Sequence, residues 1–163
     1  MRVIAFVALA VLSPGALAFE VNGVGLGGRE VEVKKAFPSA HCKPLEWKTG
    51  AADRRCDDSK IAFGGVQARI TVYLKADAIQ AFTLQFDTKD RDKVAAHLKG
   101  RWGPPLAEIT ESISRKDQQD RQVYKVRWEK GNDRAVLTAQ LEKKRGTLEA
   151  WRGNFSEEIY RVR

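Results

Sequence analysis

Several segments of the chain alternate between apolar and polar residues, the pattern of a β-strand with one buried and one wet side. The clearest run covers residues 67–75. The same pattern recurs at 82–86, 124–129 and 134–142, and more weakly at 61–63, 107–113 and 148–151. Turns are predicted between the runs, at 64–65, 76–77, 115–120 and 131–133. Strands joined by short turns are antiparallel, so the sequence predicts two antiparallel meanders.

Residues 29–37 and 89–102 have the spacing of amphipathic helices, and each segment is followed by a helix-ending glycine or proline. The apolar side consists of Val33 and Phe37 in the first segment, and of Val94, Leu98 and Trp102 in the second. Each strand of the meanders has one buried side, so the sheet needs a cover on one face. Two amphipathic helices are the natural cover.

We therefore predict an α+β fold in two layers, with an antiparallel meander sheet covered by two amphipathic helices. Because a helix followed by strands occurs twice, a tandem repeat with halves 19–87 and 88–163 is a further hypothesis. The length of residues 19–163 suits a single domain.

Residues 1–18 are predicted to be a signal peptide. Arg2 supplies the positive charge, an apolar run follows over residues 3–12, and Ala16 and Ala18 fit the small-residue positions before a cleavage site at Phe19. The apolar run is shorter than the roughly 20 residues that span a bilayer. We expect an exported, periplasmic protein with no transmembrane segment.

Cys42 and Cys56 are the only cysteines, and an exported protein meets an oxidising compartment. They are predicted to form a disulfide, which would constrain residues 43–58, a stretch with little periodicity. Redox or metal chemistry beside His41 and Asp57 is the weaker alternative, because the chain has no Cys-x-x-Cys motif.

The 163 residues carry a formal net charge of +8, with 43% hydrophobic and 31% charged residues, as in ordinary globular proteins. The basic residues are spread along the chain, whereas nucleic-acid-binding proteins usually gather them in a stripe. We expect no nucleic-acid partner. The one tight cluster, Lys143-Lys144-Arg145, is either a solvated turn before Gly146 or a contact for an anionic partner.

Residues suited to catalysis are sparse. His41 and His97 are the only histidines, which gives little support to a Ser–His–Asp hydrolase, and Asp57-Asp58 is interpreted as a solvated loop end. The glycine run at 23–28 lacks the lysine of a phosphate-binding loop. No metal or cofactor motif occurs. The sequence therefore predicts a protein that is not an enzyme, with a hydrolase as the weaker alternative.

A glycine-containing lead, a short helix ending in an aromatic residue and proline, and then strands occur twice, at Phe37-Pro38 and at Trp102-Gly103-Pro104. Over most of residues 23–151 this plan resembles the small periplasmic folds of the BamE-like (SmpA/OmlA) and β-lactamase-inhibitor-protein-like group. The chain lacks the lipidated cysteine of BamE. The resemblance implies a protein that binds other proteins through its sheet or loops, and it assigns no functional residue.

Two kinds of function stay open. The first is a binding or inhibitor-type protein that uses its wet sheet face or its disulfide loop. The second is an envelope accessory protein in electrostatic contact with an anionic surface, and a small-molecule carrier is a weaker third. Tryptophan and arginine are enriched at interface hot spots. The candidate partner-binding residues are Trp47, Lys48, Arg54 and Arg55 in the loop, and Lys143, Lys144 and Arg145. Packing against the fold is an equally good interpretation of Trp47.

Overall fold

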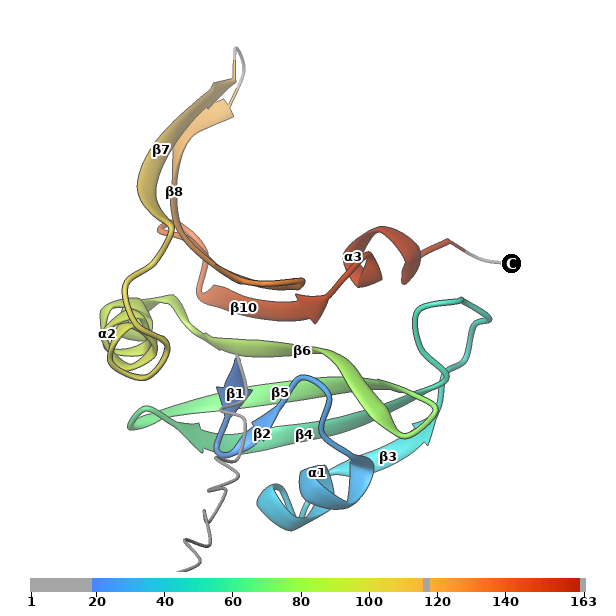
Figure 1. Cartoon of the computed structure of the whole chain (residues 1–163). Helices are drawn as coiled ribbons and strands as arrows, with labels where there is room; N and C mark the ends of the chain where they lie inside the picture. Colours follow the sequence, from blue (N-terminus) through green and yellow to red (C-terminus); the bar gives the residue numbers. More distant parts are fainter. Residues whose placement is uncertain (1–18, 116–117, 162–163) are drawn as a thin grey trace, which may run out of the picture.

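The computed structural model describes residues 19–115 and 118–161, so the predicted signal peptide lies outside the described residues. The described chain is built around an eight-stranded antiparallel sheet (Figure 1). In spatial order its strands are β3 (His41–Pro44), β4 (Arg54–Phe63), β5 (Val66–Lys75), β6 (Ala78–Asp87), β10 (Arg145–Arg152), β9 (Asp133–Gln140), β8 (Gln118–Lys130) and β7 (Ala107–Arg115). The fold is of the α+β class, as predicted.

The order of the elements along the chain repeats. Helix α1 (Glu30–Ala36) precedes β3 to β6, and helix α2 (Arg91–Trp102) precedes β7 to β10. The two sets of strands meet where β6 pairs with β10, with Leu84 directly opposite Leu148. The sheet is therefore continuous across the boundary between residues 87 and 88.

The sheet face that packs against α1 and α2 carries the hydrophobic core, and we call it the inner face. Four leucine and isoleucine side chains lie in register on adjacent strands there and are at most 2% exposed: Ile70, Leu84, Leu148 and Leu137. Buried side chains of α1 and α2 belong to the same core, and the predicted two-layer cover by these two helices does not describe it. The hairpin of β1 (Glu20–Val21) and β2 (Val24–Gly25) adds buried side chains to the same core (Figure 1).

Side-chain hydrogen bonds satisfy backbone donors at the start of α1 and of the 3-10 turn Thr88–Asp90 that precedes α2. At α1, the Glu32 carboxylate accepts from the backbone N–H of Arg29 at 2.6 Å, and Asp77 accepts from the N–H of Glu30 at 3.1 Å. Before α2, the Asp87 carboxylate accepts from the N–H of Lys89 at 3.0 Å. These carboxylates satisfy backbone donors that the first helical turn leaves free.

Gly146 is required by a close approach at the centre of the sheet. It lies opposite Phe86, and a Cβ atom at this position would come within 2.6 Å of the Phe86 ring. Glycine therefore allows the Phe86 ring to lie over β10 in the core.

Residues 43–58, which show little periodicity in the sequence, contain the end of β3 and the first half of β4. Two features hide β4 from a period-two analysis. Its inner-facing positions include polar Arg54 and Asp58, and a bulge between Asp58 and Ile61 shifts the register. The carboxylate of the buried Asp58 accepts from the backbone N–H of Lys60 at 3.0 Å within this bulge.

The polar turn predicted at 115–120 is too long. Strand β7 runs to Arg115 and β8 begins at Gln118, with these two residues paired. The first residue of β8 that pairs with β9 is Val123, so the end of the β7–β8 hairpin extends beyond the rest of the sheet. Residues 107–114 of β7 are exposed, and exposed residues need no apolar alternation, which is why the sequence pattern is weak there.

Candidate binding face

The face of the sheet opposite α1 and α2, which we call the outer face, presents a continuous surface across the strands. Its side chains follow the registers of the strand pairs. One row runs through Asp57, Thr71, Thr83, Glu149, Val136 and Arg127; the next runs through Arg55, Tyr73, Ala81, Trp151 and Arg134. The β7–β8 hairpin rises on this side, and helix α3 (Phe155–Glu158) lies on the same side beyond the end of β10 (Figure 1). The outer face is therefore concave.

The predicted disulfide between Cys42 and Cys56 is present and joins two residues that face each other across β3 and β4. The loop that it closes reaches α3. The Trp47 Nε1–H donates to the carbonyl of Ile159 at 2.8 Å, and the Thr49 hydroxyl donates to the carbonyl of Glu158 at 2.7 Å. The loop and the end of the chain thus hold each other over one side of the outer face.

A small second core lies under these contacts. Ala51, Ala52 and Ile159 are buried in it, and Leu45, Trp47, Tyr73 and Phe155 pack against them. The Tyr73 and Phe155 rings lie 5.3 Å apart between centroids. The Trp47 ring is therefore half-buried in this second core, where it helps to fix α3.

The other loop candidates lie on different sides of the protein. Lys48 is exposed. Arg54 faces inward, where its Nε–H donates to the Glu30 carboxylate at 2.8 Å. Arg55 faces outward and pairs with Asp57 at 3.0 Å. Adjacent residues of a strand point to opposite faces, so Arg54 and Arg55 do not share one surface.

The basic cluster Lys143, Lys144 and Arg145 lies at the other end of the outer face. Lys144 and Arg145 line a shallow depression together with Arg69 of β5, a residue that sequence analysis did not connect with them. Arg145 and Trp151 lie at opposite ends of β10, about 20 Å apart at the rise of an extended strand. The structure thus separates the basic cluster from the disulfide loop.

Sequence analysis did not select the side chains that form the pocket beside α3. Tyr73, Glu149, Trp151, Phe155 and Tyr160 belong to its lining. The alternation of β10 could have placed two of them on the outer face, because Glu149 and Trp151 alternate with the buried Leu148 and Ala150. Their proximity to Tyr73 and α3 depends on contacts between distant parts of the chain.

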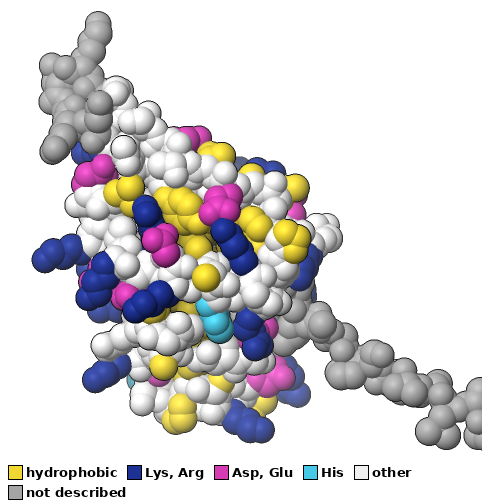
Figure 2. All heavy atoms as spheres, turned by 90° about the vertical axis from the view of Figure 1, so that its left-hand side faces the viewer, with side chains coloured by type: hydrophobic (Ala, Val, Ile, Leu, Met, Phe, Trp, Pro, Cys, Tyr) yellow, Lys and Arg dark blue, Asp and Glu magenta, His cyan; other side chains and the backbone are white. Residues whose placement is uncertain are grey.

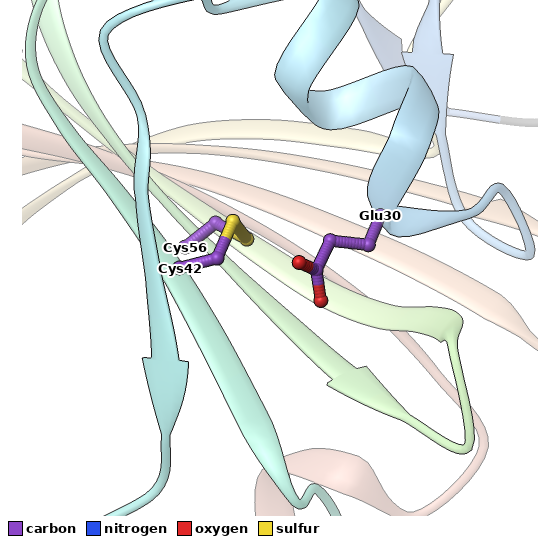
Figure 3. A group of neighbouring side chains, drawn as sticks. All are labelled: Glu30, Cys42 and Cys56. Atoms are coloured by element: carbon purple, nitrogen blue, oxygen red, sulfur yellow. A yellow bond between two sulfur atoms is a disulfide. The ribbon is translucent and has the colours of Figure 1, made fainter.

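The Glu30 carboxylate points toward the disulfide, and one oxygen of Glu30 and the two sulfurs lie within 4.8 Å of one another (Figure 3). Metal ions bind thiolates, and both sulfurs are committed to the disulfide bond. The carboxylate is bound to Arg54 and Lys34, and the Arg54 hydrogen bond, followed by that of Lys34, lowers the pKa of Glu30. This group therefore acts as an ion-paired link between α1 and β4.

The two histidines lie in structural settings. His41 is exposed on β3, at the edge of the sheet. The His97 ring on α2 packs edge-on against the Phe63 ring, with 4.8 Å between centroids. His97 also closes the space above the Gly64 turn, where an added Cβ would come within 2.8 Å of its ring.

Strand β7 forms the second edge of the sheet and is exposed over most of its length. Leu106, Ile109 and Ile113 are 59%, 44% and 42% exposed. Figure 2 looks onto this side of the molecule and shows hydrophobic side chains between charged ones. Ile109 and Ile113 share the outer face with Lys125 and Arg121 of β8, so charge borders the apolar edge.

No protein-family model, curated protein or solved structure matches the chain significantly. Among the described residues, no helix combines the length and apolar character needed to cross a membrane.

Proposed function

We propose that this is an exported, periplasmic, non-enzymatic binding protein that holds a protein partner on the concave outer face of its sheet. The shape and composition of that face give the main support for this proposal. It extends over all eight strands, is bounded by the β7–β8 hairpin and by α3, and presents tyrosine, tryptophan and arginine side chains. These residue types are enriched where proteins bind each other.

The size of the face supports the proposal. Eight strands give seven spacings of about 4.8 Å, or roughly 34 Å across, and eight residues of β10 extend for about 26 Å. The product, near 900 Å², is an upper bound for the open area because the disulfide loop and α3 lie over one side, and it is of the order of the roughly 800 Å² that each partner buries in a standard protein interface. A partner with a convex surface would fit this face without a large change in the sheet.

The disulfide supports export, because disulfides persist in oxidising compartments. We include the signal peptide at residues 1–18 in the proposal on the sequence pattern alone. The repeated order of a helix and four strands supports a tandem plan like that of the β-lactamase-inhibitor-protein-like group. We propose this relation as one of architecture, and it carries no residue from that group to this chain.

The test is photo-crosslinking in cells that make the full-length protein. A benzophenone amino acid replaces Val136 on the outer face or, as matched control, Val31, which is 65% exposed on α1. We expect a crosslinked species of defined mass with position 136 and none with position 31. Equal crosslinking at both positions would overturn the proposal.

A third crosslinker at Lys144 separates the two kinds of contact. A partner held by the outer face crosslinks at position 136 in about 0.5 M salt, where the Debye length is roughly 4 Å. Crosslinking at position 144 alone, lost at that salt concentration, would overturn the outer-face proposal in favour of an electrostatic contact through the basic cluster.

A further inference from the structure

The pocket beside α3 has the properties of a site for a positively charged group. It lies on the outer face between β5, β6, β10 and α3, and its volume is about 160 Å³. On this measure a water molecule needs roughly 10–15 Å³, so the pocket has room for a long side chain. Its walls are mainly aromatic, from Tyr73, Trp151, Phe155 and Tyr160.

Glu149 supplies the negative charge of this pocket. Its cross-strand neighbours on the outer face are the uncharged residues Thr83 and Val136. Among the described residues, no basic side chain forms a salt bridge with Glu149, and burial raises the pKa of its carboxyl. Glu149 is exposed on β10, so its carboxylate is open to a ligand in the pocket, and a bound cation would pair with it.

Two polar groups near the pocket also bear on which ligand it can take. The Arg55 guanidinium, the basic group opposite Tyr73, already pairs with Asp57. The Trp151 Nε1–H is withdrawn from solvent and has no acceptor in the described part of the chain. A peptide-borne lysine or arginine offers a cation for Glu149.

The walls favour the same class of ligand. Aromatic faces attract ammonium and guanidinium groups through the ring quadrupole, most strongly where water is excluded. An anionic group would be repelled by the Glu149 carboxylate, and a purely apolar group would gain no charge interaction with it. A carboxylate beside aromatic walls therefore favours a cationic ligand over an anionic or apolar one.

We propose that this pocket receives the lysine or arginine side chain of a protein partner bound on the outer face. The assignment rests on the proposed function for the origin of the cation, but the chemistry of the pocket can be tested without a partner. The probes are Nα-acetyl-arginine methylamide and Nα-acetyl-lysine methylamide. The norleucine analogue, which has a similar length and no charge, is the matched control.

Binding is followed through the indole N–H resonance of Trp151 in the oxidised, signal-free protein. We expect a saturable shift with both cationic probes and none with the norleucine analogue. Glu149→Gln keeps the shape of the side chain and should weaken cation binding at least tenfold. Glu157→Gln on the exposed surface of α3 removes the same charge nearby and should leave binding unchanged.

Equal binding of the norleucine analogue, or unchanged binding in Glu149→Gln, would overturn the assignment. Tyr160→Ala offers a variant with little risk to folding, since Tyr160 is 78% exposed, and it should weaken binding severalfold. Loss of probe binding with the Val136 crosslink intact would reject the pocket assignment and leave the proposed function standing. Probe binding with no Val136 crosslink would do the reverse.

Discussion

Removal of the Cys42–Cys56 disulfide should lower stability without abolishing the sheet. The bond joins neighbouring strands, and the sequence separation of the cysteines is 14. For a loop of this length the chain-entropy model gives about 3 kcal/mol of stabilisation through the unfolded state. In a domain of this size, each kcal/mol shifts Tm by about 2–4 °C, so the expected fall is about 6–12 °C.

The choice of variant matters because Cys56 is only 1% exposed. Cys42→Ser with Cys56→Ser would bury a hydroxyl, which costs a further ~1–3 kcal/mol if it finds no partner. Cys42→Ala with Cys56→Ala avoids the cost of burying a hydroxyl. The alanine variant should therefore lose about 3 kcal/mol, and the serine variant as much or more.

The assay is thermal and urea unfolding of the oxidised protein, the reduced protein and both double variants. Amide exchange should show where the loss is localised. Protection of α3 should fall with that of the loop, because the loop holds α3 through Trp47 and Thr49. A Tm change below about 2 °C in both variants, or exchange that rises evenly over the sheet, would refute the reasoning.

Two further predictions concern the sheet and α1. Leu137→Asp should unfold the protein, because it places an unpaired charge at a fully buried position at a cost of several kcal/mol. Thr138→Asp, on the outer face opposite Lys125, should change the free energy of unfolding by less than about 1 kcal/mol. Similar urea midpoints for the two variants would contradict the assigned faces. Arg54 lowers the pKa of Glu30, so the ion pair stabilises the fold above the ordinary carboxyl pKa and loses this effect as pH falls through the lowered value. Glu30→Gln should therefore reduce stability at pH 7 by up to about 1 kcal/mol and have less effect near pH 3; an equal loss at both pH values, measured by urea unfolding, would exclude this account.

Sequence reasoning succeeded where one physical pattern dominated. Strand β5 alternates without interruption because its inner side packs entirely in the core, so its faces could be read directly. Strand β4 could not be read in this way, because Arg54 faces inward to meet Glu30 and a bulge shifts the parity after Asp58. Both features depend on partners that are distant in the sequence.

The candidate site shows the same limit. Composition and hot-spot chemistry drew attention to Trp47 and Arg54, which the structure places in a second core and on the inner face. The charged residue at the pocket, Glu149, has an unremarkable sequence context. Within the described residues Glu149 has no salt-bridge partner, and its cross-strand neighbours, Thr83 and Val136, are set by a register that can be seen only after folding.

The central position of β10 has a consequence for how the chain folds. Strand β6 ends at Asp87, and its partner β10 begins only at Arg145, close to the end of the chain. Until β10 is available, β6 and β9 both present bare edges with an apolar side, and such edges readily pair with other chains. Pairing between distant segments also slows folding. We therefore expect the chain to complete its sheet only after β10 has been made and, if the protein is exported, after β10 has crossed the membrane.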